Sequence, residues 1–294
     1  MVTEVSILIP VFNQDVTAMV YTLLAQCKRL AIRYEILLYD DGSEEGIKII
    51  NRPLAKQEGV VYFELPQNIG RAAIRNKLAA NAKYSHLLMM DNDCLPVSPN
   101  FVKNYLDAAH KSDVIIGGMI YADVPPPAQY RLRWKYGQKR EALCYSKRNK
   151  DPYKSFFLKN VFIKKEVLHA HPVPEVVTKY GHEDTLLGLI LQKNGIRVLH
   201  LYNPVMHTQL ETNEHYIKQT SEAIQMLKVL NQHYPMHNIN LVKCAFLLKR
   251  MRVANLFTLT FGASEKHVLK ALTAGYGSVL LFDLYRLYLF CKLN

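Results

Sequence analysis

YSHLLMMDND, residues 84–93, is an apolar run that ends in two aspartates. The run Tyr84–Met90 predicts a buried strand, and Asp91 and Asp93 come directly after it. In a sheet built from strand–helix–strand units, ligands bind at the carboxyl ends of the strands. Two carboxylates at that edge can hold a hard divalent cation, Mn²⁺ or Mg²⁺, against a diphosphate. Aspartates in an ordinary exposed turn give the same pattern, so the motif needs support from other segments.

Neighbouring segments repeat the order of strand then helix. We expect strands at residues 5–11, 34–39, 60–65 and 84–90, with helices between them near 17–29, 46–57 and 71–82. This alternation predicts an α/β fold with a mostly parallel, Rossmann-like central sheet flanked by helices. Farther along we expect helices at 100–111, 185–194 and 214–232 and strands at 113–121, 156–163 and 196–201, whereas 128–155 shows no clear periodicity.

The positive charge of the chain is concentrated in two segments. The formal net charge is +12; residues 130–160, with ten Lys or Arg and two acids, contribute +8, and residues 241–294, with eight and two, contribute +6. The remainder is slightly negative. Such segments attract phosphates, nucleic acid or anionic lipid.

Two further carboxylate pairs stand at the ends or beginnings of expected elements. Asp40 and Asp41 follow the strand at 34–39, where they can accept hydrogen bonds from a base or a ribose; an ordinary Asp/Gly turn is the alternative. Glu183 and Asp184 precede the helix at 185–194. Either could act as a general base toward an acceptor hydroxyl. The alternative is a carboxylate that stabilises a helix N-terminus.

Cationic and imidazole groups accompany these carboxylates. Asn68-Ile69-Gly70-Arg71 opens the helix at 71–82, and a helix N-terminus favours anions. Arg71 and Arg75 are one turn apart and share a face of that helix, although a capped surface helix with solvated arginines would look the same. His207, after the last expected strand, could be a third metal ligand beside Asp91 and Asp93. A surface or core histidine is the alternative.

The ordered set of these motifs, over roughly residues 4–210, resembles the family 2 glycosyltransferases of the GT-A fold. The resemblance implies a nucleotide-sugar half at about 1–122, an acceptor half at about 123–235, and a basic, apolar helical extension at 236–294. It implies a metal, Mn²⁺ or Mg²⁺, at Asp91, Asp93 and His207, and a base at Asp184, with Glu183 as the second choice. The nucleotide-sugar contacts it implies are Pro10, Phe12, Asn13, Asp40, Asp41, Asn68, Gly70, Arg71, Arg75, Asp91 and Asn92.

The resemblance also implies a reaction. We expect inverting transfer of a sugar, hexosyl or N-acetylhexosaminyl, from a nucleotide-diphospho-sugar to a hydroxyl of a glycan or lipid-linked glycan. UDP is the commonest carrier in that family. The Gln-X-X-Arg-Trp motif of the processive synthases is absent from the sequence, which favours addition of one sugar in bacterial surface-polysaccharide synthesis. The basic segment 130–160 suggests an anionic acceptor.

We expect a cytoplasmic protein that can lie on the inner face of the membrane. The N-terminus lacks a basic signal-peptide region, no run of eighteen uncharged apolar residues occurs, and the five cysteines are widely spread. The extension at 236–294 could lie on an anionic leaflet, or it could pack on the catalytic domain or a partner chain.

Two rival functions remain open. A sugar nucleotidyltransferase would need a Gly-rich loop after the first strand, but Pro10–Gln14 contains no glycine. A polyanion- or lipid-binding module without catalysis would use the basic segments alone, and it would leave the carboxylates unexplained. Nucleic acid is not an expected partner.

Overall fold

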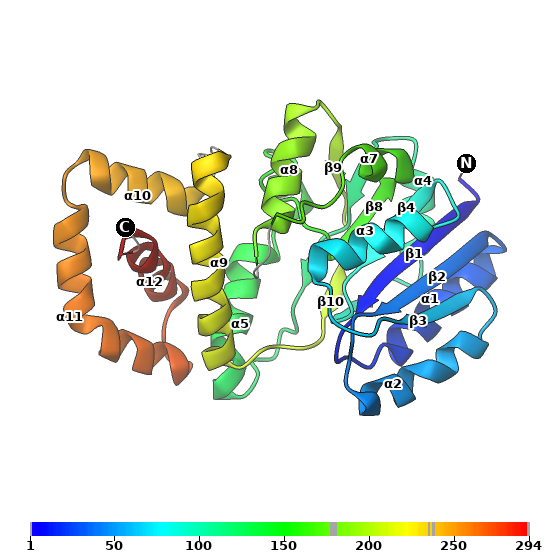
Figure 1. Ribbon diagram of the computed structural model, residues 1–294, viewed down its shortest axis with the longest axis horizontal. Helices are drawn as coiled ribbons and strands as arrows, with labels where there is room; N and C mark the ends of the chain where they lie inside the picture. The colour runs from blue at the N-terminus through cyan, green and yellow to red at the C-terminus, as the bar shows by residue number, and fades with distance from the viewer. Residues whose placement is uncertain (1, 177–180, 235, 237–238, 293–294) are drawn as a thin grey trace. The chain divides into compact units, whose positions relative to one another are not determined.

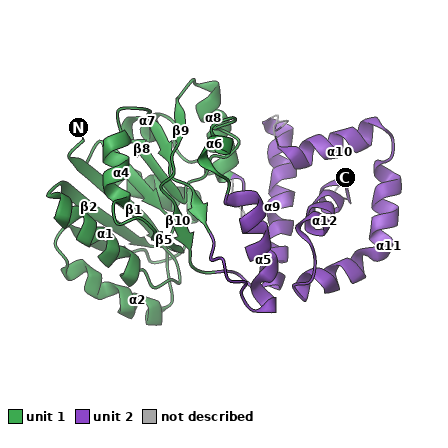
Figure 2. Ribbon diagram, turned by 180° about the vertical axis from the view of Figure 1, so that it is seen from behind, with its two compact units in different colours: residues 1–120, 143–176, 183–209 green, residues 121–142, 177–182, 210–294 purple. Residues whose placement is uncertain are grey.

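The computed structural model describes residues 2–176, 181–234, 236 and 239–292 (Figure 1). The chain divides into two compact units (Figure 2). The first unit comprises residues 1–120, 143–176 and 183–209, and the second comprises 121–142, 177–182 and 210–294. The boundary expected near residue 235 falls inside the second unit.

A seven-stranded sheet forms the centre of the first unit within the described part of the chain. Its strands lie in the order β3 (Val60–Glu64), β2 (Arg33–Asp40), β1 (Glu4–Val11), β4 (His86–Met90), β8 (Asn160–Lys164), β6 (Val114–Ile116) and β9 (Val198–His200). The β1–β2, β1–β4, β2–β3 and β6–β9 pairs are parallel, whereas β8 is antiparallel to both β4 and β6. The predicted α/β fold with a mostly parallel sheet is confirmed.

Helices cover both faces of this sheet (Figure 1). One face packs against α3 (Arg71–Asn81), α7 (Lys165–Ala170) and α8 (Glu183–Lys193), and Leu78 and Leu187 lie in a shared core with Val161. Burying each such side chain contributes about 1.5–3 kcal/mol. On the other face, Tyr105 of α4 stacks on Phe162 of β8 at 5.5 Å. The remaining helical elements of this unit are α1 (Thr17–Leu30), α2 (Glu45–Asn51), α4 (Phe101–Ala108), α6 (Tyr145–Arg148) and a 3₁₀ turn at Arg52–Lys56.

The expected strand at 113–121 is two strands in two sheets. β6 belongs to the large sheet, whereas β7 (Met119–Ile120) joins β10 (Val205–His207) and β5 (Cys94–Pro96) in a small sheet. Gly117 and Gly118 form the break between them. Gly118 has a φ of +95°, and a Cβ at Gly117 would come within 2.2 Å of the Asn203 carbonyl oxygen. The expected strand at 156–163 likewise begins only at Asn160.

The second unit is helical. It contains α5 (Arg131–Tyr136), α9 (Asn213–His233), α10 (Asn240–Arg250), α11 (Ala254–Thr273), α12 (Val279–Lys292) and shorter helical turns at Ala128–Tyr130 and Gly137–Glu141. Its core joins Leu132 to Tyr216, Leu272 and Phe282. The aperiodic segment after residue 128 is therefore partly helical and buried. Among the described residues, no helix has the length and apolarity needed to cross a bilayer.

Candidate active site

The loop that follows β2 is tied to its neighbours by polar groups. Asp41 accepts hydrogen bonds from the backbone N–H groups of Ile69 (2.7 Å) and Gly70 (3.2 Å) at the start of α3. The backbone N–H of Asn13, after β1, donates to the Ser43 hydroxyl at 2.8 Å. A carboxylate at a helix N-terminus is favourable because the free N–H groups there carry partial positive charge. The three loops therefore form one fixed edge of the sheet.

Asp40 and Asp41 both have internal partners. Asp40 has no exposed surface, and it accepts hydrogen bonds from the Ser43 backbone N–H and the Tyr62 hydroxyl, each at 2.7 Å. Asp41 is 4% exposed, and burial raises the pKa of its carboxyl. Gly42 packs closely against the segment before α3, because a Cβ at this position would lie 2.8 Å from the Asn68 backbone nitrogen. The pair shapes the loops that the sequence assigned to the nucleotide.

The exposed side chains at this edge belong to residues other than Asp40 and Asp41. Phe12 is 47% exposed and Ile69 is 38% exposed. Asn92 donates a hydrogen bond from its side chain to the Phe12 carbonyl at 3.3 Å, which ties the acidic motif to the end of β1. Pro10 lies within β1, in register with Tyr39 of β2.

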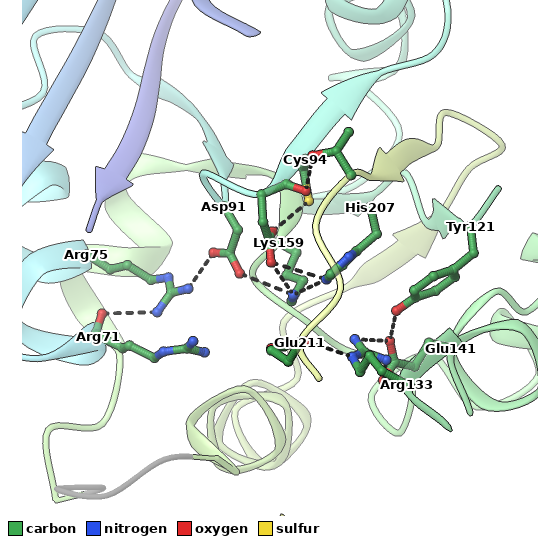
Figure 3. A network of polar contacts seen from close by, with 12 residues as sticks. Arg71, Arg75, Asp91, Cys94, Tyr121, Arg133, Glu141, Lys159, His207 and Glu211 are labelled. Atoms are coloured by element: carbon green, nitrogen blue, oxygen red, sulfur yellow. Dashed lines mark hydrogen bonds and ion pairs between the residues drawn. The ribbon is translucent and has the colours of Figure 1, made fainter. Parts of the chain in front are cut away.

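Asp91 is paired with Arg75 (Figure 3). Nη2 of Arg75 lies 2.5 Å from Asp91 Oδ1, and Nη1 donates to the Arg71 carbonyl at 3.1 Å. Burial alone would raise the pKa of Asp91, but the charges of Arg75 and Lys159 outweigh it and lower that pKa. The Arg75 side chain is only 5% exposed, whereas Arg71, one turn earlier, is exposed. Of the two arginines, only Arg71 is open to solvent.

Asp93, Lys159 and His207 form a tight triangle beside Asp91, and Figure 3 shows Lys159 and His207 near Asp91. Lys159 Nζ lies 3.2 Å from Asp93 Oδ2 and 3.2 Å from His207 Nε2, and the same His207 nitrogen is 3.2 Å from Asp93 Oδ2. Lys159 Nζ is also 3.9 Å from Asp91 Oδ2. Burial would raise the pKa of Asp93, but Lys159 and His207 hold it well below its usual value.

Strand pairing brings these groups together from distant parts of the chain. β4 and β8 pair antiparallel with Met90 opposite Asn160, so Asp91 and Lys159 are the next residues on each strand. The Asp91 backbone N–H donates to the Lys159 carbonyl at 3.2 Å. In the small sheet, β10 pairs with β5 so that His207 lies opposite Cys94. The Cys94 thiol donates to Asp93 Oδ1 at 3.2 Å.

Asp184 and Glu183 are the first two residues of α8. Burial of the Asp184 carboxyl, with the neighbouring charge of Glu183, raises its pKa to about 7, although the charge of Arg75 acts in the opposite direction. Among the described residues, Asp184 Oδ1 is enclosed without a hydrogen-bond partner. A carboxyl that exchanges its proton near neutral pH is suited to general-base catalysis.

Residues 6–172, more than half of the chain, match the family described as "Glycosyl transferase family 2". The chain belongs to this family. The matched segment includes the loops after β1 and β2, the acidic motif and Lys159, whereas Asp184 and His207 lie beyond it.

Two curated relatives each match about two fifths of this family 2 glycosyltransferase. Undecaprenyl-phosphate 4-deoxy-4-formamido-L-arabinose transferase of Aeromonas hydrophila is 31% identical over 119 residues, which are 39% of this chain and 36% of the relative. Chondroitin synthase of Escherichia coli is 30% identical over 122 residues, which are 40% of this chain and 18% of the relative. The match thus spans about a third and a fifth of these two relatives.

Solved structures confirm the GT-A fold. The mannosyltransferase PcManGT from Pyrobaculum calidifontis, in complex with GDP-Man and Mn²⁺, aligns with a TM-score of 0.57 and 14% identity over 96% of this chain and 85% of its own. TarS of S. aureus, residues 1–349, aligns with a TM-score of 0.54 and 15% identity over 96% and 89%. At these identities the likeness concerns the fold alone.

The expected metal ligands carry suitable atoms but already have a cation among them. Carboxylate oxygens and an imidazole nitrogen suit Mn²⁺. The Lys159 ammonium, however, lies within 3.9 Å of Asp91, Asp93 and His207. In the described residues, no group of three His, Cys, Asp or Glu side chains is arranged to hold a metal ion. As these side chains are arranged, they suit the Lys159 ammonium better than a divalent ion.

Lys159 is the site residue that the sequence did not single out. In the sequence, Lys159 is one of ten basic residues at 130–160. The others include Arg148, which is buried and donates to the Gly117 and Leu201 carbonyls. In the second unit, Arg133 is buried and pairs with Glu141 (Figure 3). The basic segment is therefore not one continuous surface for an acceptor.

Proposed function

We propose that this family 2 glycosyltransferase moves a sugar from a nucleotide-diphospho-sugar to a hydroxyl of a glycan or lipid-linked glycan, with inversion at the anomeric carbon. The observation that carries the proposal is the buried Arg75, whose charge acts on both Asp91 of the acidic motif and Asp184 of the candidate base. One arginine thus links the expected leaving-group site to the expected base. The names of the relatives, which include an undecaprenyl-phosphate sugar transferase and a chondroitin synthase, support a lipid-linked or glycan acceptor.

In the proposed reaction, Asp184 takes the proton of the acceptor hydroxyl. The acceptor oxygen forms its bond to the anomeric carbon while the bond from that carbon to the diphosphate oxygen breaks. The nucleoside diphosphate leaves with the electron pair. A single in-line displacement with one base inverts the configuration, by the geometric logic of inverting hydrolysis.

The leaving diphosphate needs positive charge but no proton. Arg71 is exposed at the start of α3, and 21% of the Lys159 side chain is exposed beside the acidic motif. Both can act as fixed electrostatic partners for phosphate oxygens. The Mn²⁺ or Mg²⁺ cofactor expected from the sequence stays a prediction. The Lys159 ammonium lies among the same side chains that would bind it. The donor's base is assigned to the edge formed by Phe12, Asn13 and the loop at Asp41.

The first test compares wild type with Asp184→Asn. Each is mixed with UDP-, GDP- and dTDP-sugars, and nucleotide binding is followed by calorimetry and release of nucleoside diphosphate by a coupled assay. We expect the variant to bind the nucleotide with unchanged affinity and to lose about 10²-fold or more in turnover, because only the proton acceptor is removed. The anomeric configuration of the product, read by NMR, tests inversion.

One result would overturn the proposal, and another would change the residue assigned as the base. Wild type that neither binds nor turns over any nucleotide-sugar would return the polyanion-binding alternative to first place. Near-normal turnover in Asp184→Asn would move the base to Glu183, whose variant Glu183→Gln is the matched comparison.

We also infer that the second unit contacts an anionic membrane surface, which would place the enzyme on the cytoplasmic face. α10 and α11 expose Phe246 (63%), Leu256 (61%) and Leu259 (73%). Lys243, Lys249, Arg250 and Arg252 belong to the same segment. Apolar side chains next to basic ones are the pattern of a helix that lies in the interface of an anionic leaflet.

A further inference from the structure

The ammonium of Lys159 lies within 4 Å of all three groups that the sequence predicted as metal ligands. Nζ is 3.2 Å from Asp93 Oδ2, 3.9 Å from Asp91 Oδ2 and 3.2 Å from His207 Nε2. We propose that this ammonium takes the place of a divalent cation at the acidic motif, so that the protein binds its nucleotide donor without a metal ion. For the identity of the donor, this inference rests on the function proposed above.

The backbone fixes Lys159 at this position. Lys159 directly precedes β8, and the register of β8 on β4 places it opposite Asp91. The hydrogen bond from the Asp91 backbone N–H to the Lys159 carbonyl, at 3.2 Å, continues the pairing by one residue. The Lys159 backbone is therefore held beside the ordered end of a strand. Its side chain is 21% exposed.

Each carboxylate of the acidic motif already has a cationic partner. Asp91 Oδ1 is paired with Arg75 at 2.5 Å, and Asp93 Oδ2 is paired with Lys159 at 3.2 Å. Two carboxylates thus face two cations in a partly buried site. A divalent ion bound to the same oxygens would add two positive charges next to the ammonium, where solvent screens them poorly. Such an ion could enter only if Lys159 moved away or lost its proton.

The ammonium places a positive charge beside the acidic motif, where the proposed diphosphate would bind. A lysine ammonium has three N–H donors and acts as a compact point charge. Asp93 takes one donor, and His207 Nε2 accepts another in the tautomer that carries its proton on Nδ1. In the other tautomer, His207 donates to Asp93. In either case the acidic motif orients the lysine, which then stands where a diphosphate would need positive charge.

A titration with Mn²⁺ alone tests the inference on the protein without nucleotide. Free Mn²⁺ is followed by electron paramagnetic resonance as wild type, Lys159→Met or Lys164→Met is added. Lys164 is the control, because it lies in β8 but pairs with Asp113 at 2.8 Å, away from the motif. We expect wild type and Lys164→Met to leave the free Mn²⁺ signal unchanged, and Lys159→Met to bind one ion, because its carboxylates have lost their cation.

Stoichiometric Mn²⁺ binding by wild type would overturn the inference, and so would failure of a folded Lys159→Met to bind Mn²⁺ any better than wild type. If Lys159→Met does not fold, the wild-type titration still decides. This measurement needs no donor, so it stands apart from any failure of the proposed glycosyl transfer.

Nucleotide binding supplies the second measurement. Calorimetry of UDP and GDP is carried out in EDTA and in Mn²⁺. For wild type and Lys164→Met we expect dissociation constants within about twofold in the two buffers. The cation at their acidic motif is the Lys159 side chain, which EDTA cannot remove. Lys159→Met should bind at least about tenfold more weakly in EDTA and recover part of the loss in Mn²⁺. Wild-type binding that disappears in EDTA and returns with Mn²⁺ would contradict the inference.

Discussion

At the scale of single residues, Arg75 decides the electrostatics of the site. Its buried guanidinium pairs with Asp91, and its charge also acts on Asp184 and Glu183. Without it, several carboxylates would share a poorly solvated region. Arginine suits this position because it stays charged and offers several N–H donors in a fixed plane. The sequence placed Arg75 among the phosphate contacts, whereas its geometry makes it the internal counter-charge of the site.

Arg75→Met should therefore destabilise the protein strongly. Removing one member of a buried ion pair leaves an unpaired charge and costs about 3–5 kcal/mol. The control is Arg33→Met, because Arg33 also pairs with a carboxylate, Glu4, but its side chain is 73% exposed. Such an exposed pair contributes about 1 kcal/mol or less. Urea unfolding measures both, and equal losses in the two variants would contradict this role of Arg75.

The raised pKa of Asp184 predicts a pH profile. The carboxyl must be ionised to accept a proton, and its pKa in the folded protein is about 7. We expect turnover at saturating donor to rise as pH increases through about 7. A profile already flat from pH 5 upward would contradict the assignment.

The same shift has a consequence for stability, with a definite sign. An unfolded aspartate titrates near about 4, so between that pH and about 7 the folded state holds a proton that the unfolded state has lost. The contribution of Asp184 to stability therefore falls as pH rises through this window. Asp184→Asn should gain thermal stability relative to wild type at pH 8 but not at pH 4.

At the scale of elements, hydrogen bonds join the loops after β1 and β2 to the start of α3. Asp41 accepts hydrogen bonds from the backbone N–H groups of Ile69 and Gly70, just before α3, and the Asn13 N–H donates to Ser43. Gly42, between Asp41 and Ser43, has a φ of +80° and faces the Asn68 backbone. Because each link is a hydrogen bond to backbone or a close backbone approach, the edge of the donor site is held before any ligand arrives.

Gly42→Ala should loosen this edge. A Cβ at Gly42 would lie 2.8 Å from the Asn68 nitrogen, and the positive φ is unfavourable for alanine. We expect a loss of about 1–3 kcal/mol in unfolding free energy together with weaker nucleotide binding. Gly46→Ala, in α2, is the control, because a Cβ there meets nothing within 4 Å. That change should stabilise the protein by about 0.5–1 kcal/mol; a similar loss in both variants would count against a special role of Gly42.

At the scale of the whole molecule, the chain joins an α/β unit that carries the candidate chemistry to a helical unit with exposed apolar and basic side chains. The second unit has its own core, built around Leu132, Tyr216 and Phe282. Its exposed residues on α10 and α11 are not needed for that core. These residues make up the membrane-contacting surface proposed above.

Vesicle binding tests this surface. Wild type should co-sediment with vesicles containing phosphatidylglycerol and much less with pure phosphatidylcholine, because both apolar insertion and charge contribute. The double variant Leu256→Glu, Leu259→Glu should bind at least about tenfold more weakly. Ile49→Glu is the control, since Ile49 is also exposed (59%) but lies on α2 of the first unit. Equal binding of the double variant and wild type would remove α11 from the proposed surface.

Features that depend on local pattern could be predicted from the sequence. Apolar runs predicted β1, β2, β3 and β4, and the placement of Asp41, Asp91 and Asp184 at strand or helix ends followed from turn and capping residues a few positions away. These signals are local because side-chain periodicity and turn chemistry act over one or two turns of chain. The family was predicted in another way, from the resemblance carried by the order of these motifs along the chain.

Contacts between side chains far apart in the sequence depend on the folded arrangement of the strands. Lys159 contacts Asp93 although the two are 66 residues apart, because β8 runs antiparallel to β4 in a register that no local pattern reveals. The folded arrangement also decides that Asp40 is fully buried and that Arg75 is an internal counter-charge. Sequence spacing gives the residue types at an edge, but burial and ion pairing depend on long-range strand pairing, and these set whether a lysine or a metal neutralises the acidic motif.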